Sequence, residues 1–298
     1  MATLVWSVNV VAVKVALAAS GPFTYAAARY ILGGLALWAL ARWLEGPLPL
    51  PRGRDAGLIA VAAASGVLIN QSSFTWSLAL TNADNVAMIA GTTPLLVAGW
   101  LVWRGREHFG ARVWVGLALG LAGLVLVVGA GRWSGWPGVL IALWNPLSWA
   151  LYLLLLPRLL GRYRPLTLAA LITLLGAVML IPVGAVEAAT SPPHVTWAWL
   201  GLLAYSALGA GALTTWLYLG GVRRLGPART VVYSYLQPFL TVLAAGLLIG
   251  ESVLPLQVLG GAIMLVGVVS GRPRARPGAV AATPGGRSSS LLRDMAAR

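Results

Sequence analysis

Ten apolar stretches divide this sequence, separated by short segments that carry most of its charge and much of its proline. A helix needs about 20 apolar residues to cross the hydrocarbon core of a bilayer. Because lipid offers the backbone no hydrogen-bond partner, such stretches must form helices. We therefore predict an all-α integral membrane protein with ten transmembrane helices. The expected spans are residues 2–19, 23–44, 55–80, 83–103, 112–131, 135–157, 166–188, 196–220, 227–249 and 254–271.

Composition supports this class and argues against several others. Hydrophobic residues make up 59% of the chain and charged residues 9%, whereas a soluble domain carries about 25% charged residues. The absence of cysteine excludes disulfides and thiolate metal sites. The two histidines, His108 and His194, fall in short polar connections, and the spans contain no carboxylate pair or Ser/His arrangement. We therefore expect neither an enzyme nor a bound cofactor.

The formal charge of +14 is distributed on one side of the predicted spans. Three arginines stand in each connection after spans 2, 4, 6 and 8, and six more in residues 272–298, against Arg132 alone in the opposite connections. Positive residues gather on the cytoplasmic side of membrane proteins. Both termini should then be cytoplasmic, the number of spans should be even, and no nucleic-acid partner is needed to explain the charge. Residues 272–298 have the composition of a disordered basic tail, and the excess of arginine over lysine suggests a bacterial inner (plasma) membrane.

The sequence repeats itself at an offset of 144 residues, close to half its length. Five spans fall in each copy, residues 1–132 and 133–271, and an odd number of spans requires the second copy to be inverted in the membrane. Inverted repeats are a transporter architecture, with the substrate bound near the midplane between the halves. The pairs that carry the repeat are Pro94 and Pro238, Glu107 and Glu251, Gly116 and Gly260, and Gly123 and Gly267.

Four segments carry a resemblance to a known family: "WSVNVVAVKVAL" (6–17), "AAARYILGGLAL" (26–37), "TTPLLVAGWLVWRGREHFGARVWVGLALGLAGLVLV" (from 92) and "GPARTVVYSYLQPFLTVLAAGLLIGESVLPLQVLGGAIMLVGVVS" (226–270). Each copy resembles an EamA domain of the drug/metabolite transporter superfamily. The resemblance implies ten helices in inverted five-helix halves and a secondary transporter that exports small metabolites. Amino-acid exporters of the YddG kind are the preferred analogy. Two alternatives remain: an exporter of cationic drugs, which would want an acidic residue in the cavity, and a nucleotide-sugar carrier, which would want basic ones.

Polar residues inside spans are costly and usually face the bundle interior or a water-filled cavity. We therefore predict a mid-membrane cavity with aromatic walls and a few amide and hydroxyl groups. The alternative is that these side chains bond their own backbone or a neighbouring helix. The candidate substrate-binding residues are Trp6, Asn9, Asn70, Gln71, Thr93, Asn145, Trp149, Tyr152, Thr214, Tyr218, Tyr233 and Gln237.

Two prolines and two cations inside spans need their own interpretation. Pro94 and Pro238 could be paired hinges for alternating access or static bends. Lys14 and Arg29 lie roughly 6–10 Å below the expected outer surface, at 1.5 Å per residue. They could attract a substrate carboxylate, although snorkelling or pairing with Asp84, Glu187 or Glu251 is the favoured interpretation.

Two further expectations concern energetics and assembly. No Asp, Glu or His lies near the midplane of any span, and proton-coupled transporters usually carry a titrating group there. We therefore expect a facilitator that moves its substrate down a gradient. Spans 5 and 10 are rich in glycine at helix-packing intervals and have almost no polar residues, so they suggest a scaffold or a dimer face, and the protein is expected to be a monomer or a homodimer.

Overall fold

The computed structural model describes residues 2–80, 86, 89–105, 109–128, 135–250 and 254–270. In these parts of the chain the secondary structure is helical, without a strand. Asp84, Glu107, Arg132 and Glu251, and the tail expected at 272–298, lie outside the described residues.

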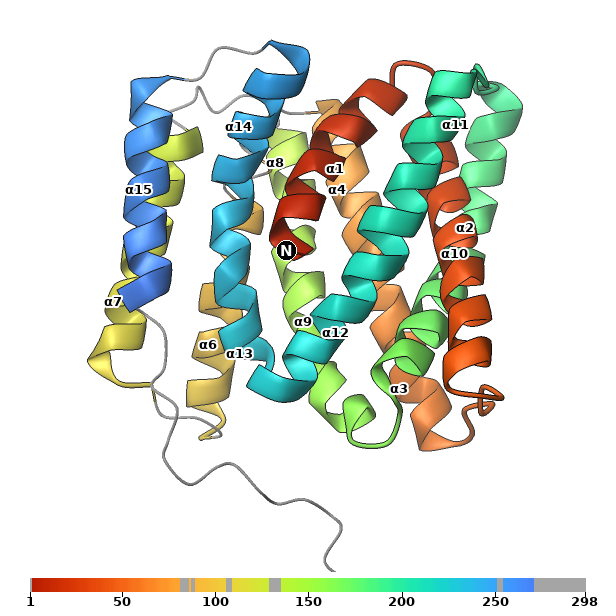
Figure 1. The fold of residues 1–298 in the computed structure, drawn as a ribbon, viewed down its shortest axis with the longest axis horizontal. Helices are drawn as coiled ribbons and strands as arrows, with labels where there is room; N and C mark the ends of the chain where they lie inside the picture. Colours follow the sequence, from red (N-terminus) through yellow and green to blue (C-terminus); the bar gives the residue numbers. More distant parts are fainter. Residues whose placement is uncertain are drawn as a thin grey trace, which may run out of the picture.

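The described helices follow the predicted apolar stretches closely (Figure 1). They are α1 (Ala2–Ala16), α2 (Pro22–Leu44), α3 (Arg54–Ala63) with the π-helical η1 (Ala64–Ile69) and α4 (Asn70–Leu80), α6 (Thr93–Trp103), α7 (Ala111–Val128), α8 (Trp136–Ala142), α9 (Trp144–Leu160), α10 (Pro165–Thr190), α11 (Trp197–Ala204) with the π-helical η2 (Tyr205–Leu213) and α12 (Thr214–Leu225), α13 (Pro227–Val231) with the 3₁₀ helix η3 (Val232–Tyr235) and α14 (Leu236–Ile249), and α15 (Pro255–Ser270).

Six of these helical segments are long and apolar enough to cross a membrane: Pro22–Leu44, Arg54–Ser77, Trp136–Leu160, Pro165–Thr190, Trp197–Leu225 and Arg229–Leu248. Shorter apolar helices cover Ala2–Ala16, Thr93–Trp103, Ala111–Leu126 and Pro255–Gly267. The prediction of an all-α, multi-pass membrane protein is therefore confirmed.

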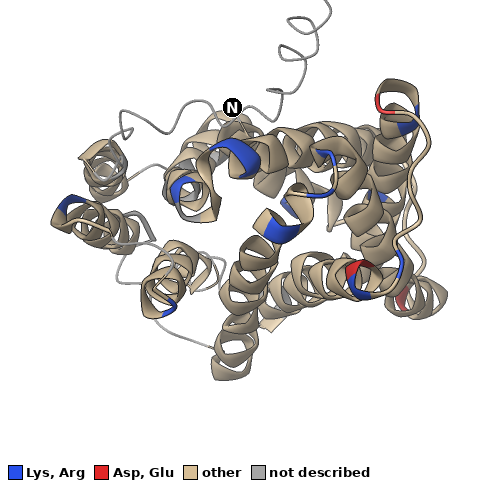
Figure 2. Cartoon of the chain, turned by 90° about the horizontal axis from the view of Figure 1, so that it is seen from below, with Lys and Arg blue, Asp and Glu red and all other residues tan. Residues whose placement is uncertain are grey.

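The helices run between two ends of the bundle, where the connections gather (Figure 1). Seen from below in Figure 2, one of these ends carries many of the Lys and Arg positions. The connections at this end include the one from α2 to α3, with Arg52, and the one from α9 to α10, with Arg162 and Arg164. The uneven distribution of basic residues in the sequence thus corresponds to one end of the fold.

Two helix pairs form opposite sides of the bundle, α7 with α15 and α2 with α10 (Figure 1). The first pair is in close backbone contact at glycines. A Cβ added to Gly123 would lie 2.5 Å from the carbonyl oxygen of Gly260, and one on Gly267 would lie 2.8 Å from that of Gly116. A side chain larger than hydrogen would force the helices apart, and these are the four glycines that define the sequence repeat.

The second pair is joined at both ends by carboxylates. Glu45, the C-cap residue of α2, accepts hydrogen bonds from the Thr167 N–H at 2.9 Å and from its hydroxyl at 2.6 Å, in the first turn of α10. Glu187, in the last turn of α10, accepts one from the Thr24 N–H at 2.7 Å, in the first turn of α2. Each carboxylate therefore satisfies an orphan donor at the positive end of the neighbouring helix dipole.

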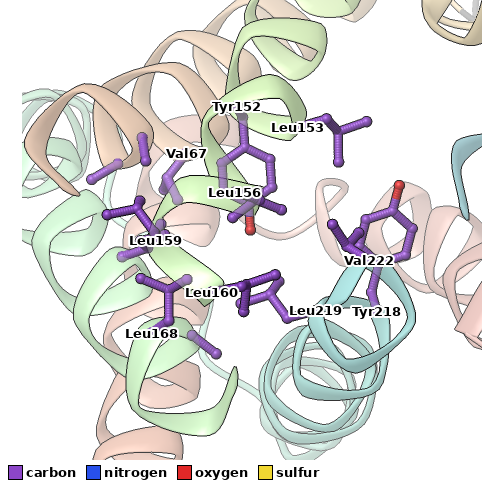
Figure 3. Close-up of a cluster of buried hydrophobic side chains, with 14 of the residues drawn as sticks. Val67, Tyr152, Leu153, Leu156, Leu159, Leu160, Leu168, Tyr218, Leu219 and Val222 are labelled. Atoms are coloured by element: carbon purple, nitrogen blue, oxygen red, sulfur yellow. The ribbon is translucent and has the colours of Figure 1, made fainter. Parts of the chain in front are cut away.

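The largest buried cluster lies where α9 faces α10 and α12 (Figure 3). Leu156 and Leu159 of α9 and Leu219 of α12 are fully buried in it. Tyr152 and Tyr218 extend the same cluster. This apolar packing fixes α9 against α12. It thereby positions Tyr152, one turn before Leu156, and Tyr218, which precedes Leu219.

Candidate functional site

Four aromatic side chains from three helices form one cluster: Trp6 of α1, Trp149 and Tyr152 of α9, and Tyr218 of α12. Trp6 packs edge-on against Trp149, with ring centroids 6.3 Å apart, and lies 5.0 Å from Tyr218. Trp149 lies 4.8 Å from Tyr152 and 6.0 Å from Tyr218. All four were predicted from the sequence as substrate-binding candidates, and the fold brings them together.

The two π-helical segments contact this aromatic cluster from the two halves of the chain. A Cβ added to Gly66, in η1, would lie 2.6 Å from the ring of Tyr152, so this glycine leaves the space that the ring occupies. Trp6 donates its indole N–H to the carbonyl of Ala210, in η2, at 2.9 Å. Because π-helical turns shift the helix register and recur at functional sites, their position beside these rings marks the region as a candidate site.

An amide network lies one helical turn away. Asn70 donates to the carbonyl of Asn145 at 3.2 Å, and Asn145 donates back to the carbonyl of Asn70 at 3.3 Å. Gln71 donates to the Asn70 side-chain oxygen at 3.4 Å and accepts from the Arg29 guanidinium at 2.6 Å. Asn145 precedes Trp149 by one turn of α9, so both lie on one helix face. The network therefore connects Arg29 of α2 to the aromatic cluster.

Several predicted residues bond backbone groups or neighbouring helices, as the alternative interpretation allowed. Thr93 donates to the carbonyl of Ala90 and Thr214 to that of Gly209, both at 2.7 Å. The Asn9 side-chain oxygen accepts a hydrogen bond from Ser206 at 2.6 Å. The bond between Ser206 and Asn9 links η2 to α1, whereas the two threonine bonds stay within their own spans. Ser206 was not among the predicted residues, and its only signal was a serine within an apolar stretch.

Comparison with known proteins agrees with this architecture. A model described as the EamA-like transporter family matches residues 1–129 and 136–270. This chain belongs to the EamA-like transporter family.

Several relatives of this chain are described as transporters. An "Uncharacterized transporter" of Archaeoglobus fulgidus is 27% identical over 272 residues, covering 89% of this chain and 92% of that protein. A "Probable terminal-alkyne amino-acid exporter" of Streptantibioticus cattleyicolor is 28% identical over 281 residues, covering 90% of each. The "Uncharacterized inner membrane transporter YedA" of Escherichia coli strain K12 is 25% identical over 284 residues, covering 89% and 86%. A solved crystal structure has the same fold, with a TM-score of 0.77 at 22% identity, covering 93% of this chain and 96% of that one.

In this EamA-family transporter, Tyr233 and Gln237 lie in the span made of α13, η3 and α14, and their place in the substrate site stays a prediction. Tyr233 packs against a second buried cluster that contains Ala98, Leu117 and Met264. Gln237 contributes its backbone carbonyl, which accepts from the Ser7 hydroxyl at 3.2 Å. The sequence interpretation placed the two side chains on one face of a continuous helix. Tyr233 lies within the 3₁₀ helix η3 and Gln237 lies in α14, so the constant α-helical rotation on which that face was drawn does not hold between them.

The two paired prolines begin helices instead of kinking them. Pro94 lies in the first turn of α6, which begins at Thr93 after a turn at 91–92. Pro238 lies in the first turn of α14, which begins at Leu236 after η3. Proline is tolerated there because the first N–H groups of a helix have no intrahelical partner. The span of Pro94 is interrupted by the turn at 91–92, whereas the span of Pro238 stays helical over Arg229–Leu248 with η3 inside it. The role of the two prolines as hinges or static bends stays a prediction.

The two cations inside spans differ in environment. Lys14 is exposed in the last turn of α1. Arg29 is half-buried, donates to Gln71 and lies over the ring of Tyr30, 5.0 Å from its centroid. Glu187, one of the partners expected for these cations, is instead the cap of α2. The other two, Asp84 and Glu251, lie outside the described residues.

Proposed function

We propose that this protein exports small metabolites, amino acids foremost, as a facilitator that works by alternating access between two inverted five-helix repeats. The observation that carries the proposal is the composition of the site. Trp6 and Asn70 belong to the first predicted repeat, whereas Asn145, Trp149 and Tyr218 belong to the second. A substrate bound there would contact both halves, which is the arrangement that alternating access requires.

Three features of the packing support ten spans in inverted repeats. First, helix contacts in one repeat have counterparts in the other. The contact of α1 with α14 corresponds to that of α9 with α6, and the pairs α2–α10 and α7–α15 each join a span to its own counterpart. The π-helical segments η1 and η2 fall in corresponding spans. The Pro-x-Thr starts of α2 and α10, each capped by a carboxylate, also correspond. The four shorter apolar helices then complete the spans, with residues 1–132 and 133–271 as the repeats.

The chemistry of the site favours amino acids over cationic drugs. Amide groups and aromatic rings line it, and the three carboxylates among the described residues are engaged elsewhere: Glu45 and Glu187 as helix caps, and Asp55 with Arg162. A site that binds cationic drugs is expected to contain an acidic residue. The name of the Streptantibioticus cattleyicolor relative agrees with this choice of substrate class.

The same distribution of carboxylates favours a facilitator. Glu45, Asp55 and Glu187 all lie at or near helix ends, and a proton-coupled transporter usually carries a titrating group in mid-span. The basic end of the bundle (Figure 2) would face the cytoplasm under the positive-inside rule. Both termini would then be cytoplasmic, in a bacterial inner membrane, with the protein acting as a monomer or homodimer.

The test is counterflow of labelled amino acids by the purified protein in liposomes, with nucleotide sugars and cationic drugs as competitors. Trp149→Ala should reduce transport by about tenfold or more, because an aromatic contact carries both buried area and ring–ring attraction. The matched control is Trp197→Ala, since Trp197 is 89% exposed at the start of α11. Counterflow of none of the amino acids, or equal transport by the two variants, would refute the proposal, as would transport that requires an imposed proton gradient.

A further inference from the structure

Arg29 is a charged side chain held inside the bundle by neutral partners. It is the eighth residue of α2, which begins at Pro22, and thus lies about 10 Å from that helix end at 1.5 Å per residue. A cation at such a depth is expensive and usually marks the path of a substrate or an ion. Its guanidinium carries five N–H donors in a fixed fork, and the described residues supply Gln71 as a hydrogen-bond acceptor and Tyr30 as a ring beneath it.

The acidic residues that could neutralise Arg29 are used elsewhere in the described part of the chain. Glu187, at the same end of the bundle, accepts from the Thr24 N–H. A Cβ on Gly21 would lie 2.3 Å from its carboxyl carbon, so that glycine makes room for the carboxylate at the helix start. Glu45 caps α10 at the opposite end of α2, and Asp55 pairs with Arg162. All three carboxylates of the described residues are thus engaged away from Arg29, so within this part of the chain the fork keeps donors for an anion that arrives from outside the protein.

Gln71 and Tyr30 connect the guanidinium to residues around the aromatic cluster. Gln71 lies next to Asn70, whose reciprocal bonds with Asn145 fix that part of α4 against α9. Tyr30 packs against the buried cluster that contains Tyr152 and Tyr218. A ligand whose anionic group meets Arg29 would therefore have aromatic surface nearby for an apolar side chain.

We propose that Arg29 binds the carboxylate of the transported amino acid, with Gln71 as the positioning residue for its guanidinium. The inference rests on the proposed function and narrows it to substrates with a free carboxylate. Arg–carboxylate pairs are frequently bidentate and stronger than neutral hydrogen bonds. Amino-acid amides and decarboxylated amines, which lack this group, should then be poor substrates.

The experiment compares L-phenylalanine with L-phenylalaninamide in liposomes, with the wild-type protein and three variants. Wild type should transport the acid about tenfold to a hundredfold better than the amide, the effect of one charge-assisted pair. Arg29→Gln should remove most of that preference by reducing transport of the acid. Arg42→Gln is the matched control, because it makes the same change at an exposed position of the same helix, and it should behave as wild type.

Gln71→Glu separates a binding role from a structural one. The new carboxylate would lie where the amide oxygen now accepts from Arg29 and would occupy the guanidinium. A purely structural Arg29 would gain an ion pair and transport normally, whereas a carboxylate-binding Arg29 would be blocked, with transport of the acid falling about as far as in Arg29→Gln.

The outcomes separate this inference from the proposed function. If wild type transports no amino acid, the proposed function fails. If it transports the acid and the amide equally, the function stands and the role of Arg29 is refuted. Transport of the acid by Arg29→Gln or Gln71→Glu at the level of Arg42→Gln refutes it as well. Should Arg29→Gln not fold, the wild-type preference and Gln71→Glu still decide.

Discussion

The carboxylate cap of α10 gives the sharpest prediction for stability. Glu45→Ala removes two hydrogen bonds that one carboxylate oxygen accepts, from the Thr167 N–H at 2.9 Å and from its hydroxyl at 2.6 Å. It also removes a negative charge at a helix N-terminus. A lost N-terminal cap costs about 0.5–2 kcal/mol, and hydrogen bonds to charged groups contribute about 1.5–3 kcal/mol. Because Glu45 is half-buried and water can reach part of it, we expect a loss of about 2 kcal/mol in the free energy of unfolding.

The contacts also rank the related variants. Thr167→Val loses the hydroxyl bond and keeps the N–H bond, so its cost should be about 1 kcal/mol. Glu187→Ala removes one hydrogen bond, which its carboxylate accepts from the Thr24 N–H, and should cost less than Glu45→Ala. Asp55→Ala is the control: its side chain is 19% exposed, but that of its partner Arg162 is 62% exposed. Ion pairs open to water contribute about 0–1 kcal/mol, and the long bond from the Tyr163 hydroxyl, at 3.4 Å, adds little.

Reversible unfolding in mixed micelles, followed by tryptophan fluorescence, measures these free energies. The double variant Glu45→Ala/Thr167→Val should be little worse than Glu45→Ala alone, since both changes remove the same hydroxyl bond and sites in direct contact are not additive. A cost for Glu45→Ala no larger than that of Asp55→Ala would refute the capping argument. If the two costs add in full, the hydrogen bond between the Thr167 hydroxyl and Glu45 is refuted.

Three further substitutions test the packing. Gly123→Val should destabilise the protein by about 3 kcal/mol or more in the same unfolding assay, because the added atoms meet the backbone of Gly260 at 2.5 Å; an unchanged midpoint would contradict the close contact of α7 and α15. Gly66→Ala should cost about 1–3 kcal/mol and displace the Tyr152 ring, whose Cδ2 would lie 2.6 Å from the new Cβ; altered transport kinetics would report the displacement, and wild-type kinetics would argue against it. Asn70→Leu should cost about 1–3 kcal/mol, the usual penalty for buried polar groups left without partners, because the carbonyl of Asn145 loses its donor; Asn145→Leu should match it, and a cost confined to one of the two would contradict the reciprocal pair.

Much of the fold could be predicted because lipid leaves the backbone few choices. An apolar stretch in a bilayer has to be helical, so the helix positions followed from hydrophobicity alone. The glycines that define the repeat, Gly116, Gly123, Gly260 and Gly267, meet between α7 and α15, a pairing that the sequence analysis had not predicted. For the site, Trp6, Trp149, Tyr152 and Tyr218 do lie together. Aromatic residues within spans are informative because their size makes contact with a neighbouring helix almost unavoidable.

The remaining features depended on tertiary contacts that periodicity does not encode. The caps by Glu45 and Glu187 require α2 and α10 to be neighbours, although their Pro-x-Thr starts were visible in the sequence. The face shared by Tyr233 and Gln237 was drawn on an ideal α-helix, and the hydrophobic pattern carries no signal for the 3₁₀ turns of η3. It likewise carries no signal for the turn at 91–92 that precedes α6 and Pro94. A helical wheel assumes one constant rotation per residue, and the described part of this chain departs from it in five of its spans.

Those departures are not spread evenly through the molecule. The flanking pairs α2–α10 and α7–α15 are regular helices, joined by carboxylate caps at one side and by glycine contacts at the other. The segments with π or 3₁₀ turns or a break, which include η1, η2 and η3, lie between those pairs. Irregular turns hold fewer ideal hydrogen bonds and so can change conformation at lower cost than a regular helix. We therefore expect any rearrangement during transport to occur in these central segments, of which η1 and η2 contact the aromatic cluster, while the flanking pairs keep their contacts.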